Sequence, residues 1–258
     1  MRVRILDDEL CEVIYRDEHL VAINKPSGLL VHRSPIDRHE TRFALQLVRN
    51  QIGQHVYPVH RLDKPTSGVL LFALSPEVAR ELAGQFAAGT VHKQYLAIVR
   101  GYCPDEGCID YPLQEQLDRI ADRDRARHRP PQLAVTRYQR LGRVEIAVAV
   151  DRYPQTRYSL VALQPETGRR HQLRRHMKHI GYPIIGDAKH GKGVHNRFFQ
   201  RNYDCHRLLL ACTGLGIAHP VSGAELQLQA ALDPPFLRVL KAFDWQDLVT
   251  GLPPPPAT

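Results

Sequence analysis

The chain contains 258 residues, with 35 Lys and Arg against 27 Asp and Glu, which gives a formal net charge of +8. This length suits one large domain or two small ones, and the modest positive charge is compatible with a polyanionic partner without requiring one. No apolar run approaches the roughly 20 residues of a membrane-spanning helix, so we expect no membrane partner.

Cysteine usage predicts a reducing compartment. The cysteines are odd in number, lack the close pairs typical of zinc sites and follow no secretory leader. We therefore expect a cytoplasmic protein. The five residues are Cys11, Cys103, Cys108, Cys205 and Cys212.

The N-terminal part alternates between apolar and polar residues. Over residues 12–23 this pattern predicts two short strands joined by a polar turn. The loop Asn-Lys-Pro-Ser-Gly follows at residues 24–28 and contains Lys25, and the helical spacing of residues 41–51 predicts a helix that packs on the core.

The stretch His-Arg-Leu-Asp-Lys-Pro-Thr-Ser-Gly at residues 60–68 lies between two apolar runs, as a turn between strands does. Pro65 and Gly68 restrict and shape the backbone, so Asp63 is held at the end of a strand. Residues two apart in an extended chain project to the same face, so Arg61 and Asp63 are expected to share one site and the guanidinium to keep the carboxylate ionised. An Asp beside Pro and Ser also commonly bonds its own turn, so a purely structural role stays open.

Beyond this turn, helix and strand signals follow in turn. Ser75 and Pro76 predict the start of a helix, and Gly89 its end. The next segment alternates as a strand with Lys93 and Tyr95 on one face. Further strands are expected near residues 134–141, 144–150 and 156–163, joined by short connections that make them antiparallel neighbours.

Two segments concentrate basic side chains. Residues 118–132 are charge-dense with little to bury, which predicts a mobile loop that either binds phosphates or is only solvated. Residues 167–179 predict a helix with an apolar ridge and a basic face suited to phosphate. A metal site is not expected there, because only His176 and His179 of its histidines would face together and no acidic ligand lies close in sequence.

Three motifs resemble those of the RluA-type pseudouridine synthases. Residues 60–68 fit the pattern His-Arg-Leu-Asp-x-x-Thr-Ser-Gly at every specified position, and residues 93–101 resemble the second motif. Residues 167–176 match the third, Thr-Gly-Arg-x-His-Gln-Leu-Arg-x-His. The resemblance implies a single α+β catalytic domain over residues 1–250, with a long, mostly antiparallel mixed sheet, flanking helices and a central basic cleft. The Pro-rich tail at 251–258 is expected to be disordered.

The resemblance also implies roles for individual residues. The reaction would convert an RNA uridine to pseudouridine: the N-glycosidic bond breaks, the uracil turns, and C5 bonds to C1′ of the ribose. Asp63 would act as a nucleophile or as a base, and both routes stay open. Arg174 would pair with Asp63, Tyr95 would pack against the target base, and no cofactor or metal is implied. With Arg61 these form the expected catalytic set, and the residues expected to contact RNA are Lys25, Lys93, Arg169, Arg170 and Arg175.

The sequence departs from the family pattern at two places, and the first of them bears on the substrate. His190 stands where the family turn Gly-Asp-x-x-Tyr-Gly has tyrosine, which resembles a branch that modifies uridine 65 of tRNA at the foot of the T arm. Ala211 and Cys212 replace part of a usual Leu-His-Ala, and no role is assigned there.

We expect a monomer that acts on tRNA without an obligate protein partner. Ribosomal RNA is the alternative substrate, and a non-catalytic RNA-binding protein is an alternative against which the complete motif around Asp63 argues.

Overall fold

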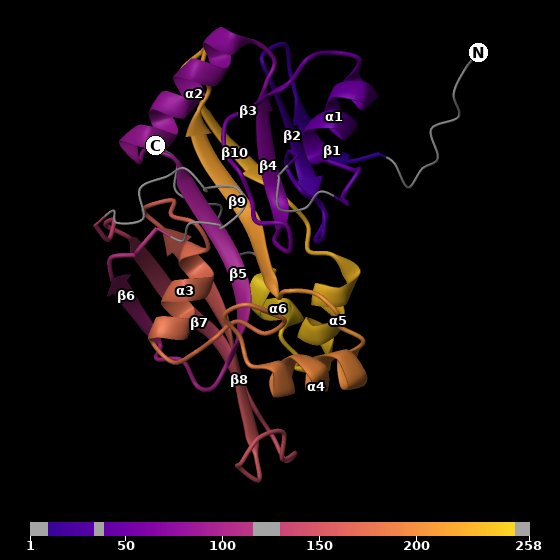
Figure 1. Ribbon diagram of the computed structural model, residues 1–258, viewed down its shortest axis with the longest axis vertical. Coiled ribbons are helices and arrows are strands. Elements are labelled where there is room, and N and C mark those ends of the chain that lie inside the picture. The colour runs from indigo at the N-terminus through magenta and orange to yellow at the C-terminus, as the bar shows by residue number, and fades with distance from the viewer. Residues whose placement is uncertain (1–9, 34–38, 116–129, 251–258) are drawn as a thin grey trace, which may run out of the picture.

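The computed structural model describes residues 10–33, 39–115 and 130–250. Within these ranges the chain builds one ten-stranded mixed sheet in the order β1-β2-β4-β9-β5-β8-β7-β6, with β3 also beside β4 and β10 also beside β9 (Figure 1). Among the described strand pairs only β4 and β9 run parallel. The strands are β1 (Glu12–Arg16), β2 (Leu20–Lys25), β3 (Tyr57–Pro58), β4 (Ser67–Ala73), β5 (His92–Arg100), β6 (Glu106–Asp110), β7 (Val135–Ile146), β8 (Thr156–Pro165), β9 (Leu210–Ala218) and β10 (Glu225–Gln229).

The helices flank this sheet, and side chains cap the N-termini of α2 and α5. Ser75 accepts a hydrogen bond from the backbone N–H of Val78 and precedes a first-turn proline, and left-handed Gly89 ends the helix, as the sequence predicts. Asp233 caps α5 in the same way. The helices are α1 (Ala44–Ile52), α2 (Pro76–Ala88), α3 (Gln172–His179), α4 (Gly193–Tyr203), α5 (Pro234–Ala242) and α6 (Gln246–Val249).

Strand alternation divides the core around β5 and β8 into two faces. Leu96 and Ile98 of β5 pack with Phe199 of α4 and with α5, whereas Ala97 and Val99 pack with Leu173 of α3. Because Tyr95 shares the second face by alternation, it points to the side of the sheet that α3 covers. Figure 1 shows α3 against β7 and β8, with α4 and α5 together at the bottom of the view.

The parallel contact between β4 and β9 brings the Asp63 turn into the middle of the sheet. Gly68 pairs with Cys212 in this short contact and has a positive φ of 109°. A Cβ at Gly68 would lie 1.9 Å from the carbonyl oxygen of Cys212, so only glycine permits this approach. The turn before β4 is thereby held beside β9 and, through β9, near Tyr95.

Two sequence-based boundaries are wrong. The predicted strands 134–141 and 144–150 form one strand, β7, because Gly142 makes an irregularity in the ladder rather than a turn and packs against Trp245. The helix predicted over 167–179 begins only at Gln172, whose side-chain oxygen accepts hydrogen bonds from Thr167 and from the backbone of Arg169 and holds those residues as a loop.

Some expectations concern segments that the structure does not describe. The tail 251–258 and most of the basic segment 118–132 lie outside the described residues. In the ranges that are described, no helix combines the length and apolar character needed to cross a bilayer.

Candidate active site

Asp63 lies in the loop that enters β4, and neighbouring backbone groups fix this loop. The carbonyl of Asp63 accepts a hydrogen bond from the N–H of Thr66, and the carbonyl of Lys64 accepts one from Gly28. Ser27 donates to the carbonyl of Pro65 at 2.8 Å. The loop after β2 therefore holds the turn in place through these hydrogen bonds. The side chain of Asp63 stays 22% exposed.

The side chain of Lys25 lies between this loop and the turn. Its side chain has no exposed area, and its Nζ donates to the carbonyls of Pro26 and Leu29, each at 2.8 Å, and of Lys64 at 3.3 Å. Burial lowers its pKa to about 7. The predicted contact of Lys25 with RNA is therefore corrected, because an enclosed ammonium cannot reach phosphate; it ties two loops together instead.

Arg174 joins two carboxylates from different parts of the chain. Its Nη1 donates to Oδ2 of Asp63 at 3.0 Å, while Nε and Nη2 donate to the two oxygens of Asp187 at 2.7 and 2.8 Å. The side chains of Arg174 and Asp187 are only 7% and 1% exposed. Burial acts to raise the pKa of Asp187, but hydrogen bonds from Arg174 and from the backbone of His190 outweigh it and lower that pKa. The predicted pairing of Arg174 with Asp63 is present.

Arg61 takes a different position from the one predicted. It is exposed, and the described residues show no ion pair between it and Asp63. Residues 61–63 belong to no strand, so the alternation of side chains along a paired strand does not fix where Arg61 points. Arg174 supplies the cation that Arg61 was expected to supply.

Tyr95 sits half-buried on β5, where it packs between the core around β4 and the core beneath α3. Its register partners are Cys212 on β9 and Leu163 on β8. Burial, followed by the neighbouring Cys212 and Asp63, raises its pKa well above the ordinary value, so the hydroxyl stays protonated. The strand that follows the Asp63 turn and the strand of Tyr95 meet at Cys212, with which Gly68 and Tyr95 both pair.

Two histidines complete the surroundings of Asp63, and the sequence reasoning assigned neither a role in the site. His171 precedes α3 with a φ of 55°, which turns its Nε2 to 3.9 Å from Oδ2 of Asp63. Its Nδ1 lies 3.1 Å from Nε2 of His190. Burial lowers the pKa of His171 to about 4, against the opposing effect of Asp63. Its place in the third motif was visible in the sequence, but its left-handed backbone was not.

The remaining residues predicted to contact RNA surround α3 and β5. Arg169 and Arg170 are exposed just before α3, and Arg175 is half-buried on it. Arg169 donates from Nε to the carbonyl of Leu133. Lys93 is half-buried beside Tyr95, and burial lowers its pKa. Their contact with RNA stays a prediction.

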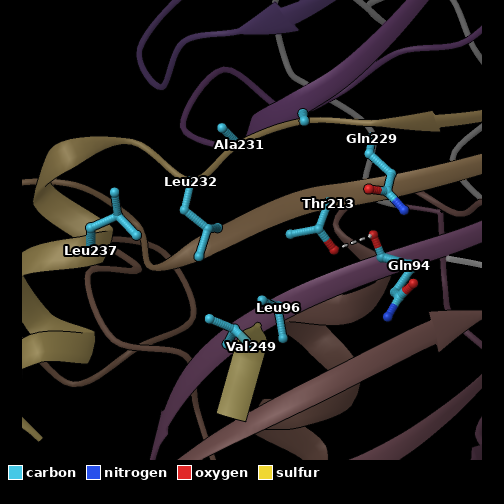
Figure 2. A pocket seen from close by; sticks show the side chains of 9 residues that line it. Gln94, Leu96, Thr213, Gln229, Ala231, Leu232, Leu237 and Val249 are labelled. Carbon is cyan, nitrogen blue, oxygen red and sulfur yellow. Dashed lines mark hydrogen bonds between the residues drawn. The ribbon is translucent and has the colours of Figure 1, made fainter. Parts of the chain in front are cut away.

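A hollow of about 250 Å³ opens elsewhere, between β5, β9, β10 and the C-terminal helices (Figure 2). Gln94 and Leu96 line it, and the Thr213 hydroxyl donates to the carbonyl of Gln94 at 3.4 Å. Because these two residues alternate with Tyr95, the hollow faces the other side of the sheet and is separate from the Asp63 site. Within the described ranges, no three His, Cys, Asp or Glu side chains gather as a metal site.

Comparison with known proteins places this arrangement in a family. The family described as RNA pseudouridylate synthase matches residues 19–179, which is more than half of the chain. The chain therefore belongs to the RNA pseudouridine synthases, as its three motifs predict, and its α+β fold with a mostly antiparallel mixed sheet agrees.

Several relatives share about half of the sequence and carry one name, tRNA pseudouridine synthase C. That of Pectobacterium carotovorum is 54% identical over 95% of this chain and 65% of its own length. That of Vibrio parahaemolyticus is 49% identical over 92% and 96%, and that of Yersinia pestis 52% over 94% and 95%. The chain thus spans just under two thirds of the first of these relatives and nearly all of the other two.

Solved structures give the same result for the fold. Human RNA pseudouridylate synthase domain containing 4 superposes with a TM-score of 0.67 at 27% identity, over 90% of this chain and 93% of that one. Human RNA pseudouridylate synthase domain containing 1 shares the fold with a TM-score of 0.65 at 21% identity, over 98% and 100%.

Proposed function

We propose that the chain converts a uridine of tRNA to pseudouridine, and that the target is uridine 65 at the foot of the T arm. The observation that carries the chemistry is the contact of Asp63 with Arg174 at 3.0 Å. The choice of tRNA is supported by the relatives, which are named tRNA pseudouridine synthase C, and the choice of position by His190 in the turn after α3.

The proposed role of Asp63 needs an ionised carboxylate. A guanidinium that is itself buried and anchored on Asp187 donates to this carboxylate, in the position to balance a negative charge. Among the described residues, Arg174 and His171 both approach the Asp63 carboxylate at Oδ2, so Oδ1 is the oxygen we assign to the reaction. It would act as a nucleophile or remove a ribose proton. The isomerisation itself requires no redox change and no phosphate energy.

The target uridine must leave its stack before C5 and C1′ can be reached. Tyr95 offers an aromatic face for the displaced base beside Asp63. Arg169, Arg170, Arg175 and Lys93 are the side chains we propose for phosphate contact around this point, in a basic cleft. We further propose that the protein works as a cytoplasmic monomer without an obligate protein partner.

The test is positional. Pseudouridine is mapped in total RNA from cells that contain the protein and from cells that lack it, and the expected difference is the loss of one modification at tRNA position 65. If the missing modification lies in ribosomal RNA while every tRNA is unchanged, the substrate proposal is wrong although the chemistry at Asp63 survives. If no RNA changes at all, the proposed activity is contradicted and the alternative of a non-catalytic RNA-binding protein is the one to test.

A further inference from the structure

His171 occupies a position that the chemistry at Asp63 does not yet use. Its backbone is left-handed, a conformation that only three described residues other than glycine adopt, and this geometry turns the imidazole toward the carboxylate. The ring is mostly enclosed, with 14% of the side chain exposed. Strained backbone of this kind tends to persist where the surrounding structure fixes a functional group.

The second ring nitrogen of His171 has a defined partner. Nδ1 of His171 and Nε2 of His190 lie 3.1 Å apart, so one of them carries the proton and the other accepts it. His190 is in turn fixed, because its backbone N–H donates to Asp187, the residue that also anchors Arg174. Asp187 therefore holds both the Arg174 guanidinium and, through His190, the imidazole of His171.

The position of Asp63 decides which of the two imidazoles donates the hydrogen bond between them. If His171 donated from Nδ1, its Nε2 lone pair would face the carboxylate, so two acceptors would oppose each other. If His190 donates from Nε2, His171 carries its proton on Nε2 and directs an N–H toward the carboxylate side. The charged and titratable groups around the His171 ring are Asp63, Arg174, Arg170 and His190, and burial among them lowers its pKa to about 4, which keeps one proton on the ring at neutral pH.

The N–H of His171 does not reach Asp63. At 3.9 Å from Oδ2 it is beyond hydrogen-bond distance, and Oδ2 is already bound by Arg174. A uridine beside Asp63 presents carbonyl oxygens and ribose hydroxyls that accept hydrogen bonds. Building on the proposed function, we propose that His171 donates its Nε2–H to an oxygen of the target uridine, and that His190 is a positioning residue that holds His171 in the donating tautomer.

The experiment compares four single variants and one double variant, His171→Asn with His190→Phe, in single-turnover pseudouridine formation on a tRNA transcript. His171→Asn keeps a residue that tolerates the left-handed backbone but shortens the donor. His190→Phe removes the donor to His171, whereas His190→Gln retains a side-chain N–H. His179→Phe is the matched control, because His179 is exposed at the far end of α3 and a phenyl ring can keep its stacking on Tyr111.

We expect His171→Asn and His190→Phe each to lower the single-turnover rate at saturating enzyme by at least about tenfold, as the loss of a positioned donor does. The enzyme concentration that gives half of the maximal rate should change little. The double variant should be no slower than either single one, because both changes remove the same interaction. His190→Gln should restore the rate to within about threefold of wild type, and His179→Phe should match wild type. Thermal unfolding of all variants should be similar, which separates this role from a structural one.

Two outcomes overturn the proposal and leave the proposed function intact. In the first, His171→Asn reacts within about twofold of the wild-type rate while Asp63→Asn is inactive. In the second, the rate loss of the double variant is the product of the losses of the two single variants, which shows that the two changes act independently. Loss of folding in His190→Gln as well as His190→Phe would also contradict it, since the donor would then serve stability. An inactive wild-type protein on every RNA would instead refute the proposed function.

Discussion

Arg174 donates to Asp63 and to Asp187 at the same time, at 3.0 Å through Nη1 and at 2.7 and 2.8 Å through its other two nitrogens. The buried guanidinium of Arg174 therefore positions the partly exposed carboxylate of Asp63 and is itself held in place by the buried carboxylate of Asp187. The two acids are unequal in this arrangement, because Asp187 is 1% exposed and Asp63 is 22% exposed. Asp63 is the acid that a substrate can reach.

Replacement of Arg174 should disable the site and destabilise the protein. Arg174→Met leaves Asp187 buried without its cation, which costs on the order of 3 to 5 kcal/mol. Arg174→Lys should recover part of the stability but little activity, because an ammonium cannot bind both carboxylates in the planar geometry of the guanidinium. Chemical denaturation and pseudouridine formation measure the two effects separately; equal activity of Arg174→Lys and wild type would contradict the bridging role.

Asp187→Asn should weaken stability in a manner that depends on pH. The pKa of Asp187 is lowered in the folded protein, so its ionised form contributes stability that is fully present above its unfolded pKa of about 3.9 and is lost as the pH falls below it. The stability gap between wild type and Asp187→Asn should therefore be constant from pH 8 to about 5 and shrink below about 4. A gap that widens on acidification would show that this carboxylate is not held by Arg174.

Lys25→Met should damage the active-site turn without weakening RNA binding. The change leaves the carbonyls of Pro26, Leu29 and Lys64 without their shared donor, so the turn that carries Asp63 loosens. The pKa of Lys25 is lowered to about 7 in the folded protein. Between pH 7 and the ordinary lysine pKa, the unfolded chain therefore binds more protons at Lys25 than the folded protein does. Wild type should accordingly gain stability relative to Lys25→Met as the pH rises through that range. Filter binding and unfolding curves test both parts. Weaker RNA binding with unchanged stability would return Lys25 to the RNA interface.

Tyr95→Phe should remain active, and Tyr95→Ala should not. Stacking of a base on an aromatic ring contributes roughly 1 to 3 kcal/mol and does not require the hydroxyl. The protonated hydroxyl of Tyr95 next to Cys212 is consistent with a packing role. Rates for the two variants decide the matter: equal losses in both would mean that the hydroxyl takes part in the chemistry.

The sequence predicts those parts of the molecule that short motifs encode. The turn around Asp63, the strand with Tyr95 and the basic segment before α3 all follow from local patterns, and the family resemblance pairs Arg174 with Asp63 although 111 residues separate them. Properties that depend on burial by distant segments were missed. Lys25 is enclosed because the loop after β2 folds over Lys64. Asp187 anchors the active site only because the side chain of Arg174 reaches it.

Backbone geometry accounts for the other errors. Arg61 lies in a segment outside the strands, where side-chain alternation does not fix its direction, and nothing local marks His171 as left-handed. A short connection was expected between residues 141 and 144, whereas Gly142, which packs against Trp245, is an irregularity within one long strand.

The most direct test of the account is single-turnover pseudouridine formation at position 65 of a tRNA transcript by wild type and by Asp63→Asn, with thermal unfolding of both proteins measured in parallel. The amide has nearly the same shape but no charge, so the fold should be retained while product falls to background. Activity of Asp63→Asn within about tenfold of wild type, a barrier change of only about 1.4 kcal/mol, would contradict the assignment of Asp63 as the catalytic carboxylate.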